Sequence, residues 1–150
     1  MSLDFLAIAD GLAARYAPAA VTPPTGYTNI TLSTARLPNG LATLPAVLVF
    51  PEGGDATYNA QREGQHQFRV RFLLDQSSGD LRKNMVSLLK WLGVLWDQTH
   101  AAVKLGLSST VMKALPASYE LGVFDYGGEK YDGIDVLVTV WTSDTVTLTP

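Results

Sequence analysis

The stretch from Tyr119 to Trp141 constrains the fold more than any other part of the chain. Two runs rich in β-branched and aromatic residues flank a Gly-Gly-Glu-Lys segment that begins at Gly127. This pattern predicts a strand, a tight reversal and a second strand. In the second run, alternate apolar residues predict a side that faces a core, made of Ile134, Val136, Val138 and Val140. We therefore expect a β-hairpin that forms the spine of a sheet.

Apolar residues at helical spacing predict two amphipathic helices. The first spans Ser2 to Tyr16, with Ser2 as its N-cap and a buried stripe made of Phe5, Ile8, Leu12 and Tyr16. The second runs from Asp80 to about His100 and is expected to lie across the sheet. Its predicted stripe contains Leu81, Met85, Leu88, Leu92 and Leu95, widened by Leu89 and Trp96.

Three more strands are predicted before the second helix, at Ile30–Leu37, Pro45–Phe50 and Gln65–Leu74. Residues 51–65 are polar and contain glycine, and they fit either an exposed loop or a long hairpin arm. Residues 101–117 are ambiguous, with an irregular strand around Val111–Leu115 as one option. Residues 142–150 fit either a short edge strand or a tail.

The order of these elements predicts a single α+β domain over residues 1–150. We expect a mostly antiparallel sheet, one long helix packed across it and an N-terminal amphipathic helix. Hydrophobic residues make up 47% of the chain, which is typical of a globular protein. Charged residues make up only 17%, whereas about a quarter is usual. The low charge indicates that partners cover part of the surface.

Charge is distributed unevenly along the chain, whose net charge is -3. Residues 1–119 carry ten basic and eight acidic side chains, whereas residues 120–150 carry one basic and six acidic side chains. A subunit with two oppositely charged ends suits head-to-tail contacts with copies or neighbours. A solvated acidic segment explains the same pattern, and the sequence leaves both interpretations open.

Several classes of chemistry are excluded or not expected. The chain has no cysteine, which excludes disulfides, thiolate metal sites and cysteine nucleophiles. The start M-S-L-D-F-L lacks the basic region of a signal peptide, and no apolar run reaches the roughly 18–20 residues of a membrane span. We expect a protein that is soluble when made in the cytoplasm, is not an enzyme and needs no cofactor.

Two groups of titratable residues are candidates for reactive or metal-binding sites, and neither matches a known pattern. His66 lies near Glu63, and such a pair can transfer protons, but no third group completes a recognisable pattern, so a strand-edge histidine is favoured. Acidic residues around the hairpin turn offer oxygen ligands to a hard cation, at Asp125, Glu129, Asp132 and Asp135. Their spacing does not match an EF-hand loop, so a solvated turn with acidic residues at its rim is favoured.

Basic residues alternate with aromatic ones along the predicted strand Gln65–Leu74. Because Phe68 and Phe72 alternate with Arg69 and Arg71, the aromatic side chains belong to the core and cannot stack on bases. The arginines need a carboxylate, a solvent boundary or a partner. The acidic pI of about 5.2 also disfavours a nucleic-acid binder.

The order of elements resembles a known family. An N-terminal helix and a proline-rich loop precede L-P-A-V-L-V-F, then F-R-V-R-F-L-L-D and L-R-K-N-M-V-S-L-L-K-W-L. The chain then reaches F-D-Y-G-G-E-K-Y-D-G-I-D-V-L-V-T-V. This is similar to the tail terminator, or tail completion, proteins of long-tailed bacteriophages and gene-transfer particles. The family is recognised by its architecture more than by signature residues, and other neck and minor tail proteins share much of this outline.

The resemblance implies a structural protein of the virion tail or neck. Such proteins form a ring, expected to be a hexamer, that caps the tail-tube protein, ends tube growth and docks to the head-tail connector or stopper protein. DNA would pass through the lumen of the ring without specific binding. The acidic segment 120–150 would line this lumen and repel the DNA phosphates. No catalytic residues follow from the resemblance, and no membrane is involved.

Candidate contact residues come from the side-chain chemistry, because arginine and aromatic residues contribute strongly at interfaces. They are Arg62, Arg69, Arg71, Tyr126, Glu129 and Tyr131. Another neck, connector or tail-tube subunit is the first alternative function. An alternative from a different class is a small monomeric ligand-binding or metal-binding domain that uses the acidic turn.

Overall fold

The computed structural model of the chain is an α+β domain built on one five-stranded sheet, as the sequence predicts. The structure describes residues 3–58, 62–100, 105 and 111–144. The sheet order is β1-β2-β3-β5-β4, and every neighbouring pair is antiparallel except β1 with β2. The elements are α1 (Phe5–Arg15), β1 (Leu32–Thr34), β2 (Ala46–Tyr58), β3 (Arg62–Gln76), the 3-10 helix η1 (Leu81–Asn84), α2 (Met85–His100), β4 (Val111–Tyr126) and β5 (Glu129–Asp144).

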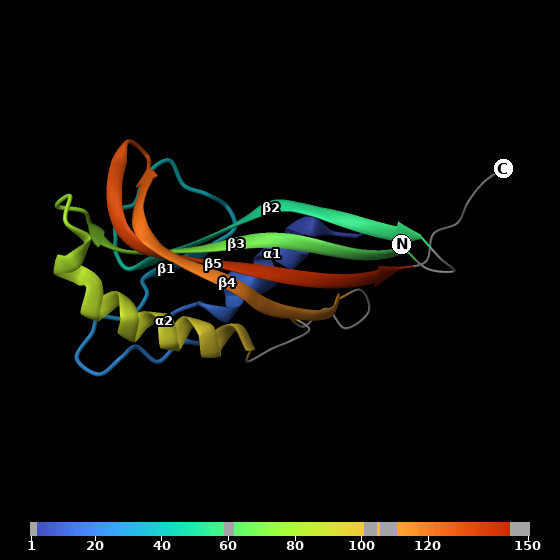
Figure 1. Cartoon of the computed structure of the whole chain (residues 1–150), viewed down its shortest axis with the longest axis horizontal. Coiled ribbons are helices and arrows are strands. Elements are labelled where there is room, and N and C mark those ends of the chain that lie inside the picture. The colour runs from blue at the N-terminus through green and yellow to red at the C-terminus, as the bar shows by residue number, and fades with distance from the viewer. Residues whose placement is uncertain (1–2, 59–61, 101–104, 106–110, 145–150) are drawn as a thin grey trace.

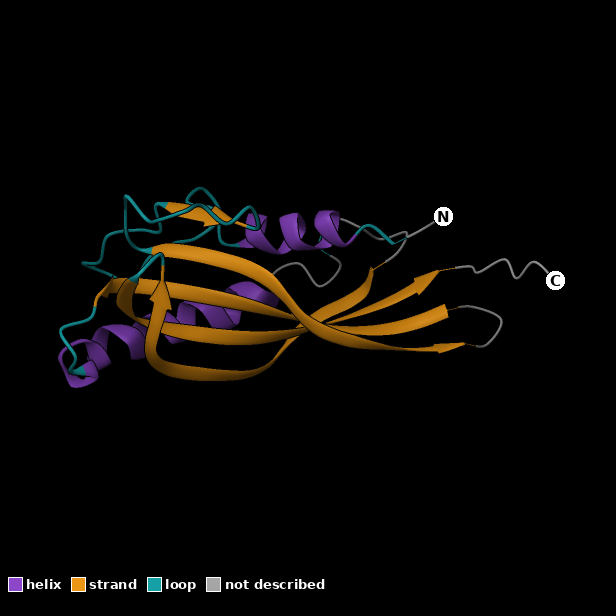
Figure 2. Ribbon diagram, turned by 90° about the horizontal axis from the view of Figure 1, so that it is seen from above, coloured by secondary structure: helices purple, strands orange, loops and turns teal. Residues whose placement is uncertain are grey.

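Both helices pack on the same face of the sheet, which we call the helix face (Figure 1). Helix α1 lies over β2 and β1, whereas α2 lies over β4 and β5 (Figure 2). The main core lies between this face and the helices. Its sheet side includes the four alternating residues predicted for the last strand, which are buried at Ile134, Val136, Val138 and Val140. The opposite face is called the outer face below.

Helix α1 begins later than the sequence predicts. Asp4 is its N-cap and accepts a hydrogen bond from the amide of Ala7 at 3.0 Å, while the predicted cap at Ser2 lies outside the described residues. The rest of the predicted stripe is buried, but Phe5 is 48% exposed. The prediction for Phe5 is wrong because it lies at the first turn of the helix, where an edge-to-face contact with the His66 ring leaves about half of the side chain exposed.

The second helix starts with η1, which Asp80 caps, and continues as α2. The predicted stripe is partly wrong. Trp91, which the prediction omitted, is completely buried and packs on Phe72 with ring centroids 4.8 Å apart. Leu89, which was expected to widen the stripe, is 53% exposed. Because α2 is apolar around most of its circumference, its periodicity alone does not identify the face that the sheet covers.

The middle strands are longer than predicted, and β1 is shorter. β2 continues through Pro51 to Tyr58 and pairs with β3 from Arg62 onward, so the described residues 51–58 and 62–65 form the two strands of a hairpin arm. A bulge between Pro51 and Gly53 accommodates the proline, which has no amide hydrogen for the ladder. β1 covers only the part of the predicted strand from Leu32 to Thr34.

The last two strands form the predicted hairpin. Its reversal uses Gly127 and Gly128, whose φ angles of 60° and 84° match a tight turn that few other residues tolerate. The irregular strand predicted around Val111 is the start of β4, and bulges follow it at Val111/Lys113 and Pro116/Ser118. The prediction for the end of the chain falls largely on residues 145–150, which lie outside the described residues.

Candidate functional site

Two arginines and one aspartate form the centre of the outer face. Arg71 on β3 lies opposite Asp135 on β5, and its Nε donates to one carboxylate oxygen at 2.7 Å. The Arg71 Nη2 donates to the other oxygen at 2.8 Å, and Arg69 donates to that same oxygen at 2.9 Å. Asp135 is only 1% exposed, so two guanidinium groups neutralise an almost fully buried carboxylate.

Arg69 also bridges to the neighbouring strand. Its Nε and Nη2 donate to the two carboxylate oxygens of Glu52 on β2, at 2.9 and 3.1 Å. The hydrogen bond from Arg69 lowers the pKa of Glu52, and the same bond raises the pKa of Arg69. The network therefore ties β2, β3 and β5 together across the outer face.

Aromatic rings complete the surroundings of Arg71. The guanidinium carbon lies 4.5 Å from the ring centroid of Phe124 on β4 and 5.3 Å from that of Phe50 on β2. The sequence left open whether Arg69 and Arg71 pair with acids of this chain or of another subunit. In the structure, both pair with acids of their own chain.

The three candidates at the hairpin turn lie in different environments. Tyr131 is 3% exposed and packs in a small outer-face cluster with Leu48 and Leu73, so its ring is not a surface contact. The Tyr126 hydroxyl donates to the carbonyl oxygen of Pro38, and partial burial, with a contribution from Tyr131, raises the pKa of Tyr126. Glu129 is exposed at the turn.

Arg62, the remaining candidate, opens β3 at the end of the arm. Its backbone pairs in register with Tyr58 on β2 and Asp144 on β5. This position is at the opposite end of the sheet from the Gly127–Gly128 turn. The structure therefore divides the sequence-predicted contact residues among the arm, the centre of the outer face and the turn.

The acidic residues near the turn do not converge on one point. Asp132 is buried on the helix face and accepts a hydrogen bond from the side-chain amide of Asn84 at 2.7 Å, whereas Asp135 is buried on the outer face. Asp125 and Glu129 are exposed. Within the described residues, no three His, Asp or Glu side chains gather as metal ligands would.

His66 and Glu63 lie on opposite faces of β3, so the structure does not bring together the pair considered from the sequence. The His66 ring packs edge to face on Phe5 at 4.9 Å, and its Nε2 lies 3.0 Å from the hydroxyl oxygen of Thr142. A Cβ at position 64 would lie 2.5 Å from that nitrogen. Gly64 thus provides the space in which the His66 ring lies.

Exposed large hydrophobic residues gather at two sides of the domain, a feature that was not predicted from the sequence. On the side of α2 and β4, they are Val86, Leu89, Met112, Tyr119 and Val123. On the side of α1 and β1, they are Phe5, Leu6 and Leu37. Trp96 and Tyr119 join the α2 and β4 surfaces through an edge-to-face contact at 6.0 Å. In the described chain, the exposed large hydrophobic residues thus lie toward the two opposite edges of the sheet, one group near β4 and the other near β1.

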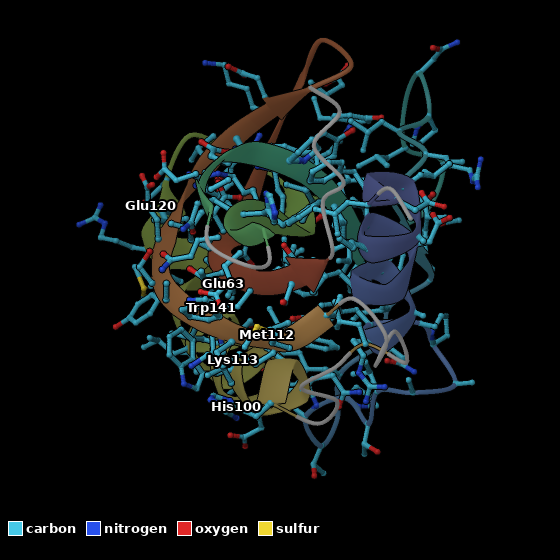
Figure 3. The ribbon with its side chains drawn as sticks, turned by 90° about the vertical axis from the view of Figure 1, so that its right-hand side faces the viewer. Glu63, His100, Met112, Lys113, Glu120 and Trp141 are labelled. Atoms are coloured by element: carbon cyan, nitrogen blue, oxygen red, sulfur yellow. The ribbon has the colours of Figure 1, made fainter. Side chains whose placement is uncertain are left out.

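Both long edges of the sheet are also open. Among the described strands, β4 pairs only with β5, and β1 pairs with β2 only from Ala46 to Leu48. Viewed along the strands, Met112 and Lys113 lie on the β4 side, away from α1 (Figure 3). Open edges and exposed apolar side chains are features of association surfaces.

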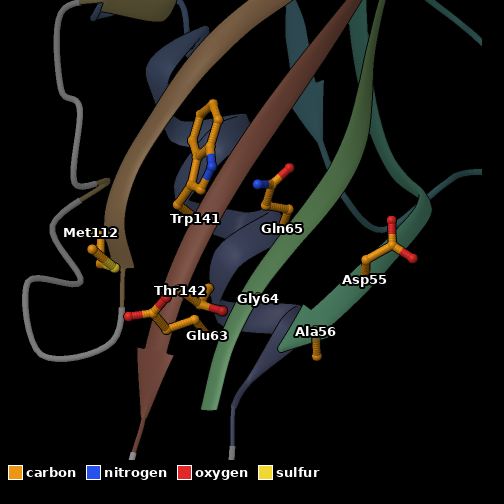
Figure 4. A pocket seen from close by; sticks show the side chains of 8 residues that line it. All are labelled: Asp55, Ala56, Glu63, Gly64, Gln65, Met112, Trp141 and Thr142. Atoms are coloured by element: carbon orange, nitrogen blue, oxygen red, sulfur yellow. The ribbon is translucent and has the colours of Figure 1, made fainter. Parts of the chain in front are cut away.

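Shallow hollows lie near the ends of the long strands. One of about 270 Å³ crosses the sheet from Asp55 on β2 to Met112 on β4, past Gln65 and Trp141 (Figure 4). Another of about 400 Å³ lies beside Phe5 and the β2 arm. Neither presents the converging nucleophile, base and oxyanion donors of an active site.

Comparison with models of known protein families and with curated proteins finds no match. Of the helices in the described ranges, neither α1 nor α2 combines the length and apolar character that crossing a bilayer requires.

Proposed function

We propose that this chain is a structural subunit that assembles with copies of itself into a closed ring at the tail or neck of a phage particle. The observation that carries the proposal is the placement of exposed large hydrophobic residues on two opposite sides of one domain. A contact that joins two different sides of identical subunits is heterologous, and repeated contacts of this kind close into a ring when the rotation permits.

The surface chemistry supports contacts between copies. The α2 side carries exposed basic residues at Lys83 and Lys90, whereas the β2–β3 arm carries exposed acidic residues at Asp55 and Glu63. The low overall charge of 17% leaves much of the surface suitable for burial. Apolar centres with complementary charges around them are typical of specific interfaces.

Within this class, we favour the ring that terminates the tail tube. The order of elements resembles that of the tail terminator family, which implies a hexameric ring bound to the tube on one face and to the head connector on the other. The protein would then reside in the virion. Rings of other neck or tube subunits are the nearest alternatives, and they share the head-to-tail geometry.

The first test is whether the purified chain forms rings. Mass photometry and negative-stain microscopy over a concentration series, with and without tail-tube protein from the same particle, should show rings or capped tube ends. Tubes polymerised with the chain should be shorter than tubes polymerised alone. A monomer at every concentration that neither binds nor shortens tubes would contradict the proposal.

Variants that block one side each make the test specific for head-to-tail assembly. Leu89→Lys blocks the α2 side and Leu6→Lys the α1 side, so each variant alone should be monomeric. A mixture retains one intact contact per pair and should form dimers but no rings. Ser78→Lys, at an exposed position in the loop between β3 and η1, is the matched control and should assemble normally. Rings from either blocked variant alone would contradict head-to-tail assembly through these two sides.

A further inference from the structure

We propose that the start of β4, residues 111–115, pairs antiparallel with the arm of β2, residues 53–57, in the next copy of this chain. This contact rests on the proposed ring and is the one that joins its subunits. Three features of the sheet point to it, namely the directions of its edge strands, the part of each edge that is open, and the charge at one row of residues.

The two edge strands run in opposite directions. Because β2 is antiparallel to β3, β3 to β5 and β5 to β4, β2 and β4 are antiparallel to one another. A second copy related by rotation about an axis along the strands keeps its strand directions. It therefore presents its β2 antiparallel to the first copy's β4, which is the more stable arrangement of a strand pair.

The open parts of the two edges lie at the same level of the sheet. The ladder pairs Asp55 on β2 with Gln65 on β3, then Gln65 with Trp141 on β5, and Trp141 with Lys113 on β4. This row runs from one edge to the other (Figure 4 shows its first three members). Rotation about an axis parallel to the strands does not change the position of a residue along that axis, so Lys113 of one copy lies opposite Asp55 of the next.

Both residues of this contact are available. Asp55 and Lys113 are exposed, and no ion pair joins either of them to another described residue. The ammonium of Lys113 lies over the Trp141 ring at 4.5 Å, which keeps the side chain on the outer face. A carboxylate and an ammonium at directly opposed positions stabilise an antiparallel strand pair.

The backbone of each segment is also suited to the pairing. Residues 53–57 follow the Pro51/Gly53 bulge and lie beyond the part of β2 that β1 covers. Gly53 and Gly54 place no side chain on this part of the edge. On β4, residues 111–115 contain the bulge between Val111 and Lys113, and they end before Pro116, which cannot donate to a ladder. Strand addition of this kind uses main-chain hydrogen bonds for affinity and side chains for specificity.

A two-fold pairing of β4 with β4 is the main competing geometry. It would bring Lys113 opposite Glu120 only by placing Pro116 and the neighbouring bulge at the centre of the paired region. That centre lacks the amide donor of Pro116, so its ladder would lose a hydrogen bond at its middle position. The pairing of β4 with β2 instead leaves Pro116 outside the contact.

Engineered cysteines test the contact directly, because the natural chain has none. Directly opposed Cα atoms in an antiparallel pair are about 4.5–5.5 Å apart, which suits a disulfide. Asp55→Cys/Lys113→Cys chains should form a covalent ladder of oligomers under mild oxidation. Asp55→Cys/Glu129→Cys chains are the matched control, with one cysteine at the far end of the sheet, and should remain uncrosslinked. A ladder supports the proposal, whereas products that stop at a dimer or fail to form overturn it.

Charge reversal provides a second readout. Lys113→Glu and Asp55→Lys should each weaken assembly several-fold, and the double variant should recover part of the loss, whereas Lys130→Glu at the hairpin turn should have no effect. Rings that ignore all of these changes would overturn the strand contact and leave the proposed function intact. A chain that forms neither rings nor crosslinks, with tail-tube protein present, would overturn both.

Discussion

Arg71 and Asp135 occupy directly opposed positions on β3 and β5 and form a two-pronged ion pair, with donor-acceptor distances of 2.7 and 2.8 Å. Arg69 adds a third bond to the same carboxylate. A paired arrangement of this kind is stable only while both charges are present, because a single buried charge lacks the water that would otherwise solvate it. The network is therefore a structural element of the outer face that is sensitive to the loss of one member.

Replacing the buried carboxylate should destabilise the fold strongly. Asp135→Ala leaves two guanidinium groups without their shared acceptor, and we expect a loss of about 3–5 kcal/mol in the free energy of unfolding. Urea denaturation followed by tryptophan fluorescence measures this loss. Glu52→Gln, which removes the more exposed acid of the same network, should cost no more than about 1 kcal/mol. Equal effects of the two changes would contradict the assignment of Asp135 as the centre.

Trp91 should contribute far more to stability than Leu89, although the two are close on the same helix. Trp91→Ala removes a completely buried ring from its contact with Phe72, and core truncations of this size cost about 3–5 kcal/mol. Leu89→Ala removes a side chain that is largely exposed and should change stability by about 0.5 kcal/mol. Thermal and urea unfolding of both variants, at protein concentrations too low for assembly, measures the two losses. A larger loss for Leu89→Ala than for Trp91→Ala would contradict the assignment of the buried side of α2.

Gly64 should not tolerate even one added methyl group. A Cβ there would lie 2.5 Å from the His66 Nε2 and 2.8 Å from the Thr142 hydroxyl oxygen. Gly64→Ala must displace one of these groups, and such overpacking costs about 1–3 kcal/mol. Gly40→Ala is the control, because a methyl group added there would have no atom within 4 Å and the backbone needs no positive φ. Matching stabilities for the two variants in urea unfolding would argue against the packed His66 ring.

Tyr16 should make the fold sensitive to alkaline pH. Burial raises the pKa of its hydroxyl to about 12 from an ordinary value of 10.0. The unfolded chain therefore loses this proton at a lower pH than the folded chain, so folding stability is unaffected below about pH 10 and falls between pH 10 and 12. The expected loss is about 2–3 kcal/mol, at about 1.4 kcal/mol per pKa unit.

Urea unfolding at several values between about pH 9 and 12 measures that slope. Tyr16→Phe has no hydroxyl to titrate and should lose less stability over the same interval, even though it also loses the contact with Thr99. Parallel pH profiles for the two proteins would show that Tyr16 does not titrate as its burial requires.

The sequence was sufficient for the strongly periodic parts of the fold. Ile134 to Val140 alternate without interruption, and the strand that they predict has the predicted core face. The paired glycines at the turn were equally informative, because few other residues adopt their backbone angles. Local chemistry determines both features, so no knowledge of the rest of the chain was needed.

The remaining features depend on contacts that are distant in sequence. Pro51 was predicted to end β2, but pairing with β3 and a bulge carry the strand past it. Arg69 and Arg71 were recognised as arginines in need of partners, yet their common acceptor Asp135 lies more than sixty residues away. The choice between Leu89 and Trp91 likewise depends on where β4 and β5 lie under α2, which periodicity does not encode.

The smallest strand also has a consequence for errors in assembly. β1 is three residues long and occupies the edge of β2 from Ala46 to Leu48. A foreign strand that pairs with this edge of β2 cannot extend past β1, because β1 already occupies the edge at residues 46–48. The length of exposed edge is thereby limited, which restricts uncontrolled stacking of chains into fibrils. The three residues of β1 thus shorten the length of β2 that is open to pairing with a foreign strand.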